Sequence, residues 1–165
     1  MSADVEPLHL SEPAEERLVL DDYLPYRLSV ASNAVSRLIA RAYEDRFGLT
    51  IPQWRLMAVL AEDGAMTPGA IVERTAMDKV TVSRAASGLL RRRLVERQAN
   101  AADRRSHRLS LSEAGRRLHA DIAPLALAYE AALLSGLAPG EPETLRRLLE
   151  RLEGAANRLA MEAGV

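Results

Sequence analysis

Apolar residues recur at steps of three and four positions along most of this chain, and proline or glycine stands where the pattern stops. This spacing is typical of amphipathic α-helices, because residues three and four apart lie on one helical face. Pro25 suits a first helical turn and Gly48 suits a helix C-terminus, so we expect the first long helix between them. The same reasoning predicts helices over residues 52–64, 67–75, 78–93 and 112–136, and a last helix carrying Leu145 to Leu159.

The hydrophobic period changes after Arg93. Leu94 and Glu96, and later Arg108 to Leu111, alternate between apolar and polar residues as half-buried strands do. The stretch 98–106 between them is too charged for a core and is typical of an exposed hairpin tip. The predicted fold class is therefore mainly α with a small two-stranded β-hairpin.

The composition is that of one soluble domain. The chain has 165 residues, of which 48% are hydrophobic and none is cysteine, which excludes disulfides, thiolate metal sites and thiol catalysis. His9, His107 and His119 are widely spaced, so we expect no metal and no cofactor. Residues 1–20 are acidic and carry no apolar run, which predicts a disordered tail, no signal peptide and no membrane anchor. We expect a cytoplasmic protein without a membrane partner.

Charge is concentrated in one part of the chain. The net charge is −1, but Arg74 to Arg117 hold 12 basic and four acidic residues, a balance of +8, and the remainder carries −9. Such a basic segment in an acidic protein is expected where a polyanion binds. The alternative is a solvated charged surface that binds nothing.

A helix-turn-helix falls inside this basic segment. Thr67 and Pro68 open a short helix, Ala76 and Met77 form a turn, and Asp78 caps a second helix. A second helix of this kind enters the DNA major groove with its N-terminal residues facing the bases. The candidate DNA contacts are Lys79, Val80, Thr81, Ser83, Arg84 and Ser87, with Thr67 at a helix N-terminus that suits a phosphate. For each polar residue, the alternative is an exposed group without a role.

Together these features resemble the MarR family of winged helix-turn-helix transcription factors, over residues 21–160. The most specific likeness is the stretch Asp103 to Gly115, which is similar to the family's wing signature, Asp-x-Arg followed by Leu-(Thr/Ser)-x-x-Gly. The resemblance implies that Arg105 enters the minor groove and that Asp103 holds it in place, as narrow minor grooves attract arginine. Arg104 and Arg108 are then placed for phosphates. The implied architecture is a winged helix-turn-helix domain at 52–111 with dimerisation helices at 21–47 and 112–162.

The terminal helices predict a homodimer, because their apolar stripes are wider than a single core needs. The family resemblance further implies a pocket beside these helices, in which a small aromatic or phenolic ligand weakens operator binding. Aromatic acids or their coenzyme A thioesters are the narrower expectation. The candidate ligand residues are Tyr26, Arg27, Asn33, Trp54, Arg55 and His119. Core packing and surface ion pairs are the alternatives for them.

The predicted function is a homodimeric repressor that binds a palindromic double-stranded DNA operator and is released by that ligand. We expect no enzyme, because the sequence has no phosphate-binding loop, no dinucleotide fingerprint and no Ser-x-x-Lys nucleophile. The rival classes are a nonspecific architectural DNA-binding protein and a helical protein-interaction scaffold. Selective DNA binding distinguishes a repressor from both.

Overall fold

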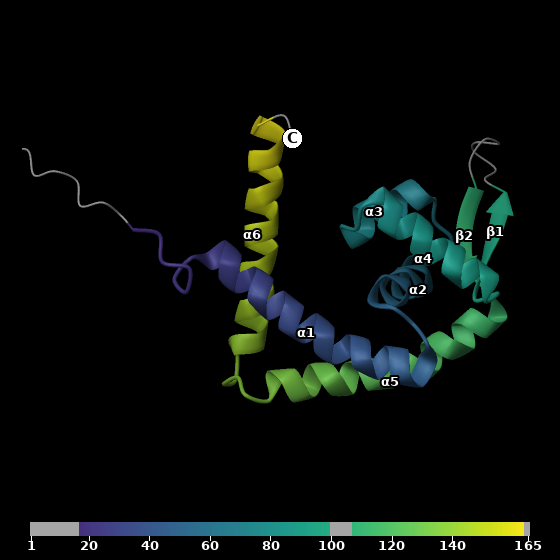
Figure 1. Cartoon of the computed structure of the whole chain (residues 1–165), viewed down its shortest axis with the longest axis horizontal. Helices are drawn as coiled ribbons and strands as arrows, with labels where there is room; N and C mark the ends of the chain where they lie inside the picture. The colour runs from purple at the N-terminus through teal and green to yellow at the C-terminus, as the bar shows by residue number, and fades with distance from the viewer. Residues whose placement is uncertain (1–16, 100–106, 164–165) are drawn as a thin grey trace, which may run out of the picture. The chain divides into compact units, whose positions relative to one another are not determined.

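The computed structural model describes residues 17–99 and 107–163 of the chain. The elements follow the order α1 (Leu24–Phe47), α2 (Ile51–Asp63), α3 (Pro68–Thr75), α4 (Lys79–Arg91), β1 (Val95–Ala99), β2 (His107–Leu111), α5 (Glu113–Leu134) and α6 (Glu141–Ala163) (Figure 1). The predicted class, mainly helical with a two-stranded sheet, is confirmed. The chain divides into two compact units, Met1–Leu38 and Ile39–Val165, and the continuous helix α1 belongs to both.

The described part of the first unit is largely exposed apolar surface. It consists of residues 17–23 and the first part of α1, and Pro25 lies in the first turn of that helix as predicted. The apolar side chains that are at least 38% exposed here are Leu18, Val19, Leu20, Tyr23, Leu24, Tyr26, Leu28, Val30, Val35 and Leu38. The first sixteen residues of the predicted acidic tail lie outside the described residues.

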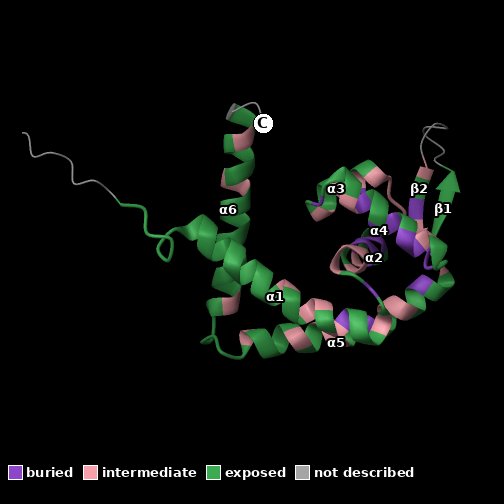
Figure 2. Ribbon diagram, viewed as in Figure 1, coloured by how far each residue is buried: buried purple, intermediate pink, exposed green. Residues whose placement is uncertain are grey.

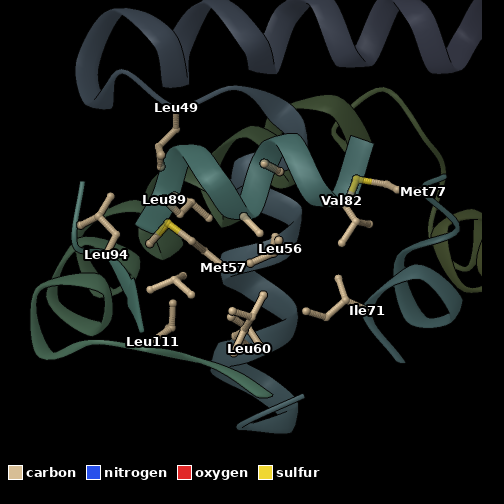
Figure 3. Close-up of a cluster of buried hydrophobic side chains, with 14 of the residues drawn as sticks. Leu49, Leu56, Met57, Leu60, Ile71, Met77, Val82, Leu89, Leu94 and Leu111 are labelled. Carbon is tan, nitrogen blue, oxygen red and sulfur yellow. The ribbon is translucent and has the colours of Figure 1, made fainter. Parts of the chain in front are cut away.

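The second unit contains the hydrophobic core, and α2 is its central helix. Leu56, Met57 and Leu60 of α2 are almost fully buried and face residues from α3, α4 and the hairpin (Figure 3). Buried residues cluster on these elements, whereas α6 is exposed along most of its length (Figure 2). The remaining labelled core residues are Leu49, Ile71, Met77, Val82, Leu89, Leu94 and Leu111.

Local capping explains where the central helices begin. Thr50 and Gln53 form a capping box at the start of α2, in which the Thr50 N–H donates to Gln53 Oε1 at 3.0 Å and the Gln53 N–H donates to Thr50 Oγ1 at 3.4 Å. Ser112 caps α5 by accepting the Gly115 N–H at 3.0 Å, as predicted. Each cap satisfies N–H groups that a helix N-terminus leaves unpaired.

The hairpin is antiparallel and is extended by a short third segment. Val95 pairs with Leu111, Arg97 with Leu109 and Ala99 with His107. Met66 adds a bridge, because its N–H donates to the Leu109 carbonyl at 2.9 Å and its own carbonyl accepts the Leu109 N–H at 2.7 Å. The hairpin is thereby joined to the segment that leads into α3.

No helix within residues 17–99 and 107–163 is both long and apolar enough to cross a bilayer.

Candidate nucleic-acid interface

The turn between α3 and α4 is built from a few local hydrogen bonds. Thr67 caps α3 by accepting the Ala70 N–H at 3.2 Å, and Ala76 ends the helix in the left-handed conformation at φ 52°. Met77 then turns into the core with 7% of its surface exposed. The chain reverses at this point, so that α4 starts from a fixed anchor.

Asp78 fixes the N-terminus of α4. Its carboxylate accepts the Thr81 N–H at 2.8 Å and the Thr81 hydroxyl at 2.6 Å. These bonds, from the Thr81 hydroxyl first and then from its N–H, lower the pKa of Asp78 below its usual value. The Thr81 hydroxyl therefore donates its proton within the cap, and only its lone pairs are available to an outside partner.

Helix α4 presents opposite faces to the core and to solvent. Val82, Ala85, Ala86 and Leu89 are buried against the rest of the unit. The exposed face carries four predicted DNA contacts in its first half and one more in the next turn, namely Lys79, Val80, Ser83, Arg84 and Ser87. Val80 is 57% exposed and places an aliphatic side chain among these polar groups. The structure thus groups these side chains on one solvent-facing surface.

A hollow of about 310 Å³ lies between α3, α4 and the hairpin. Lys79, Ser83 and Ser87 line one side of it, and Arg97 and His107 of the hairpin line another. The sequence reasoning did not single out Arg97 or His107 as site residues. Strand alternation was the available signal, since Arg97 shares a hairpin face with buried Val95 and paired Leu109. The helix and the hairpin therefore offer cationic groups to one shared surface.

Three of the predicted wing residues, Asp103, Arg104 and Arg105, lie outside the described residues. The fourth, Arg108, is exposed on β2 and donates a hydrogen bond to the Ala65 carbonyl. Arg108 thus also holds the hairpin to the segment before α3. Thr67, likewise a predicted phosphate contact, uses its hydroxyl oxygen in the α3 cap.

Two candidate ligand residues of the second unit, Trp54 and His119, form an aromatic cluster with Tyr43. The rings of Trp54 and His119 are stacked with centroids 5.3 Å apart at 16°, and Tyr43 meets Trp54 edge-on at 5.4 Å. Tyr43 is 1% exposed and was missed by the sequence reasoning, because its helical spacing marks it only as a core residue. Arg55 is exposed on α2. In the first unit, Tyr26, Arg27 and Asn33 are exposed on α1.

Burial shifts the pKa values of two titratable groups in this cluster. Desolvation lowers the pKa of His119 and so favours its neutral imidazole. Desolvation, with a smaller contribution from Tyr129, raises the pKa of Tyr43. A neutral, partly buried ring stack of this kind offers an aromatic face rather than a charge to a ligand. Among the described residues, no group of three or more His, Asp or Glu side chains is placed to hold a metal ion.

The chain is similar to one protein family and to several proteins of known structure. A sequence model of the MarR family matches residues 47–106. A probable transcriptional regulator from Pseudomonas aeruginosa is 34% identical, with 81% of this chain and 99% of that chain covered and a TM-score of 0.74. A MarR/EmrR family transcriptional regulator from Acinetobacter sp. ADP1 is 23% identical, with 86% and 99% covered and a TM-score of 0.80. BpsR from Bordetella bronchiseptica, whose DNA binding is regulated by 6-hydroxynicotinic acid, is 25% identical, with 83% and 97% covered and a TM-score of 0.77. None of the curated proteins matches the chain.

A helix-turn-helix followed directly by a β-hairpin defines a winged helix-turn-helix protein. The fold, the exposed cationic face of α4 and the family match agree on a DNA-binding transcriptional regulator. The chain belongs to the MarR family.

Proposed function

We propose that this protein is a homodimeric repressor that binds a palindromic operator and is released by a small aromatic ligand. The observation that carries the proposal is the exposed face of α4, where Lys79, Val80, Ser83 and Arg84 project from a capped helix beside the basic hairpin. The major groove of B-DNA is about 12 Å wide and admits one such helix. A two-fold dimer places two copies of α4 on two half-sites about one helical turn apart.

The proposed roles follow from the chemistry of each side chain. Lys79 and Arg84 donate to guanine O6 and N7, and Val80 meets a thymine methyl. Ser83 and Ser87 offer hydroxyl groups to bases or phosphates, and Thr81 offers the lone pairs of its hydroxyl oxygen to a base donor. The α3 N-terminus at Thr67 and the exposed Arg108 contact phosphates, and Arg97 joins them from the hairpin. The family resemblance assigns Arg105 to the minor groove, Asp103 to its support and Arg104 to a phosphate.

A selected operator provides the test of these roles. DNA is selected from a random pool with the purified protein, and anisotropy measures binding to the selected and to scrambled duplexes across a salt series. We expect roughly 10³-fold or greater preference for the selected DNA. Comparable affinity for both would favour the architectural protein, and no binding to either would favour the scaffold.

Arg84→Ala tests direct base recognition. We expect base preference to relax by about 1–3 kcal/mol at one position of each half-site, because a bidentate guanine contact is lost. Arg74→Ala is the matched control: Arg74 is an arginine of the same basic segment, but its guanidinium is held by Glu62 at 3.1 Å and Asp63 at 3.0 Å. Equal losses on selected and random DNA in Arg84→Ala would reduce Arg84 to a phosphate contact.

The aromatic cluster is the proposed centre of ligand binding. Trp54 stacks on a neutral His119, and a planar ligand could compete for either ring face. BpsR, a similar protein, responds to an aromatic acid. Tyr26, Arg27, Asn33 and Arg55 remain proposed contacts that supply polar groups for a carboxylate or phenol.

Trp54 is the only tryptophan in the chain, so its fluorescence reports on this site. We expect 6-hydroxynicotinic acid or another aromatic acid to change the emission and to weaken operator binding over the same concentration range. In His119→Ala both effects should shift to higher ligand concentration. Weakened operator binding without any change at Trp54 would place the ligand elsewhere.

A further inference from the structure

Helix α1 ends in a way that leaves two carbonyl groups for an outside donor. Gly48 takes φ +62° and its N–H donates to the Glu44 carbonyl at 3.0 Å, which is a left-handed C-cap. The carbonyls of Phe47 and Gly48 point beyond this cap. Both accept hydrogen bonds from one side chain, because Arg92 Nη2 donates to Phe47 O at 2.9 Å and Arg92 Nη1 donates to Gly48 O at 2.8 Å.

Arg92 is itself the C-cap residue of α4. Its guanidinium therefore connects the C-terminal end of α4 to that of α1, although the residues are 44 and 45 positions apart in sequence. The partial negative charge at a helix C-terminus favours a cation there. The planar fork of arginine contacts two acceptors at once, which the single ammonium of lysine cannot do in the same geometry.

No other side-chain hydrogen bond or ion pair joins α4 to α1 within residues 17–99 and 107–163. Helix α4 packs against α2 and α3 and is followed directly by β1, but a packed helix retains freedom to tilt and slide by small amounts. The two directed bonds of Arg92 restrict this motion with respect to α1, and they lie at the end of α4 farthest from its first turn.

We propose that Arg92 is a positioning residue that sets the orientation of α4 with respect to the end of α1, and thereby the half-site spacing that the dimer accepts. The inference rests on the proposed function, in which α4 reads DNA and the apolar surface of α1 takes part in the dimer. The contact itself, from Arg92 to Phe47 and Gly48, lies entirely within the second unit, Ile39–Val165.

The experiment compares Arg92→Ala, Arg92→Lys and Arg93→Ala with the wild type. Arg93 is the matched control, because it is the adjacent exposed arginine and its side chain makes no hydrogen bond among the described residues. Affinity is measured for the selected operator, for the same operator with one base pair inserted at its centre, and for a single half-site. The insertion moves the half-sites apart by about 3.4 Å and rotates one against the other.

We expect Arg92→Ala to reduce the discrimination between the two operators by about fivefold or more, with little change at the single half-site. Arg92→Lys should recover the charge without recovering the discrimination, and Arg93→Ala should behave as the wild type. Hydrogen exchange should quicken in Arg92→Ala at the Gly48 and Leu49 amides, whose hydrogen bonds form the α1 cap.

A purely structural or electrostatic role predicts a different result. Equal loss of affinity on all three DNAs, or unchanged discrimination in Arg92→Ala, would overturn the inference while leaving the proposed function intact. If the wild type showed no preference between the two spacings, this would instead contradict the dimeric operator complex. The proposed role of Arg92 would then be wrong as well. Full recovery of discrimination by Arg92→Lys would show that charge, not the two-carbonyl contact, is what matters.

Discussion

Gly115 lies in the first turn of α5, where that helix passes close to the main chain before β1. A Cβ at this position would lie 2.0 Å from the Leu94 carbonyl oxygen, which cannot move freely because it accepts the Ser112 N–H at 3.0 Å. Gly115→Ala should therefore lower the free energy of unfolding by about 1–3 kcal/mol, the usual cost of overpacking. Urea denaturation at one fixed protein concentration measures this change.

Gly69 in α3 gives the control with the opposite sign. Its added Cβ would meet no atom within 4 Å, so Gly69→Ala should stabilise the protein by up to about 1 kcal/mol through helix propensity. Equal effects of the two substitutions would show that the close approach at Leu94 does not constrain Gly115. The steric argument also explains why a glycine stands at the end of the wing signature.

His119 gives the protein a predictable response to acid. Burial lowers its folded-state pKa below the usual value of 6.5, so the unfolded chain binds a proton more readily than the folded one. Stability should be unaffected above about pH 7 and should decline as pH falls below the unfolded value, towards the folded one. His119→Phe keeps a ring against Trp54 but cannot titrate. The unfolding free energy of the wild type, measured relative to that of His119→Phe, should therefore fall from about pH 8 to about pH 5. A difference that stays constant with pH would contradict the desolvation of His119.

At the scale of elements, helix α3 of the helix-turn-helix begins at a cap that Thr67 supplies. Thr67 accepts the Ala70 N–H at 3.2 Å, and Thr67→Ala should cost about 1 kcal/mol of unfolding free energy because α3 has only eight residues. Thr67→Ser keeps the hydroxyl and should stay close to the wild type. Thermal unfolding of both variants provides the measurement, and equal stability of the two would mean that the cap contributes nothing.

Element boundaries were the part of the fold that local chemistry could predict. Thr67, Asp78 and Ser112 each cap a helix as expected, since a cap and its N–H partner lie within three residues. The hairpin was likewise predicted from alternation over a few residues. Contacts between distant segments could not be predicted, because periodicity indicates that a face is buried but not which segment covers it.

The site shows the same division. Five of the six residues that were predicted as DNA contacts on α4 are exposed, as a helical face follows from spacing, and the sixth, Thr81, is half-buried. Two contacts could not be predicted in this way: the stack of Trp54 on His119, and the hydrogen bonds from Arg92 to the carbonyls of Phe47 and Gly48. Both depend on how α1, α2, α4 and α5 pack, which local patterns do not specify. Arg97 is an intermediate case. Strand alternation indicates which face of the hairpin it lies on, but not that this face lines a hollow with α3 and α4.

At the scale of the whole molecule, a single protomer leaves many large apolar side chains exposed to solvent. Within the second unit, α6 repeats leucines at helical spacing, and all of them are at least 39% exposed: Leu145, Leu148, Leu149, Leu152 and Leu159. Soluble monomers rarely expose such a continuous stripe, so a second copy of the chain is the proposed cover.

Leu148→Glu combined with Leu152→Glu should dissociate this dimer. Near a two-fold interface the new carboxylates would be desolvated and would face like charges from the other copy. Sedimentation should give a monomer at concentrations where the wild type is dimeric, and operator affinity should fall towards that for random DNA because the two half-sites are no longer linked. Arg147→Glu, on the opposite side of α6, changes the net charge by the same amount and should remain dimeric. If the double variant stayed dimeric with its helical circular dichroism intact, the interface would have to be built without the apolar stripe of α6.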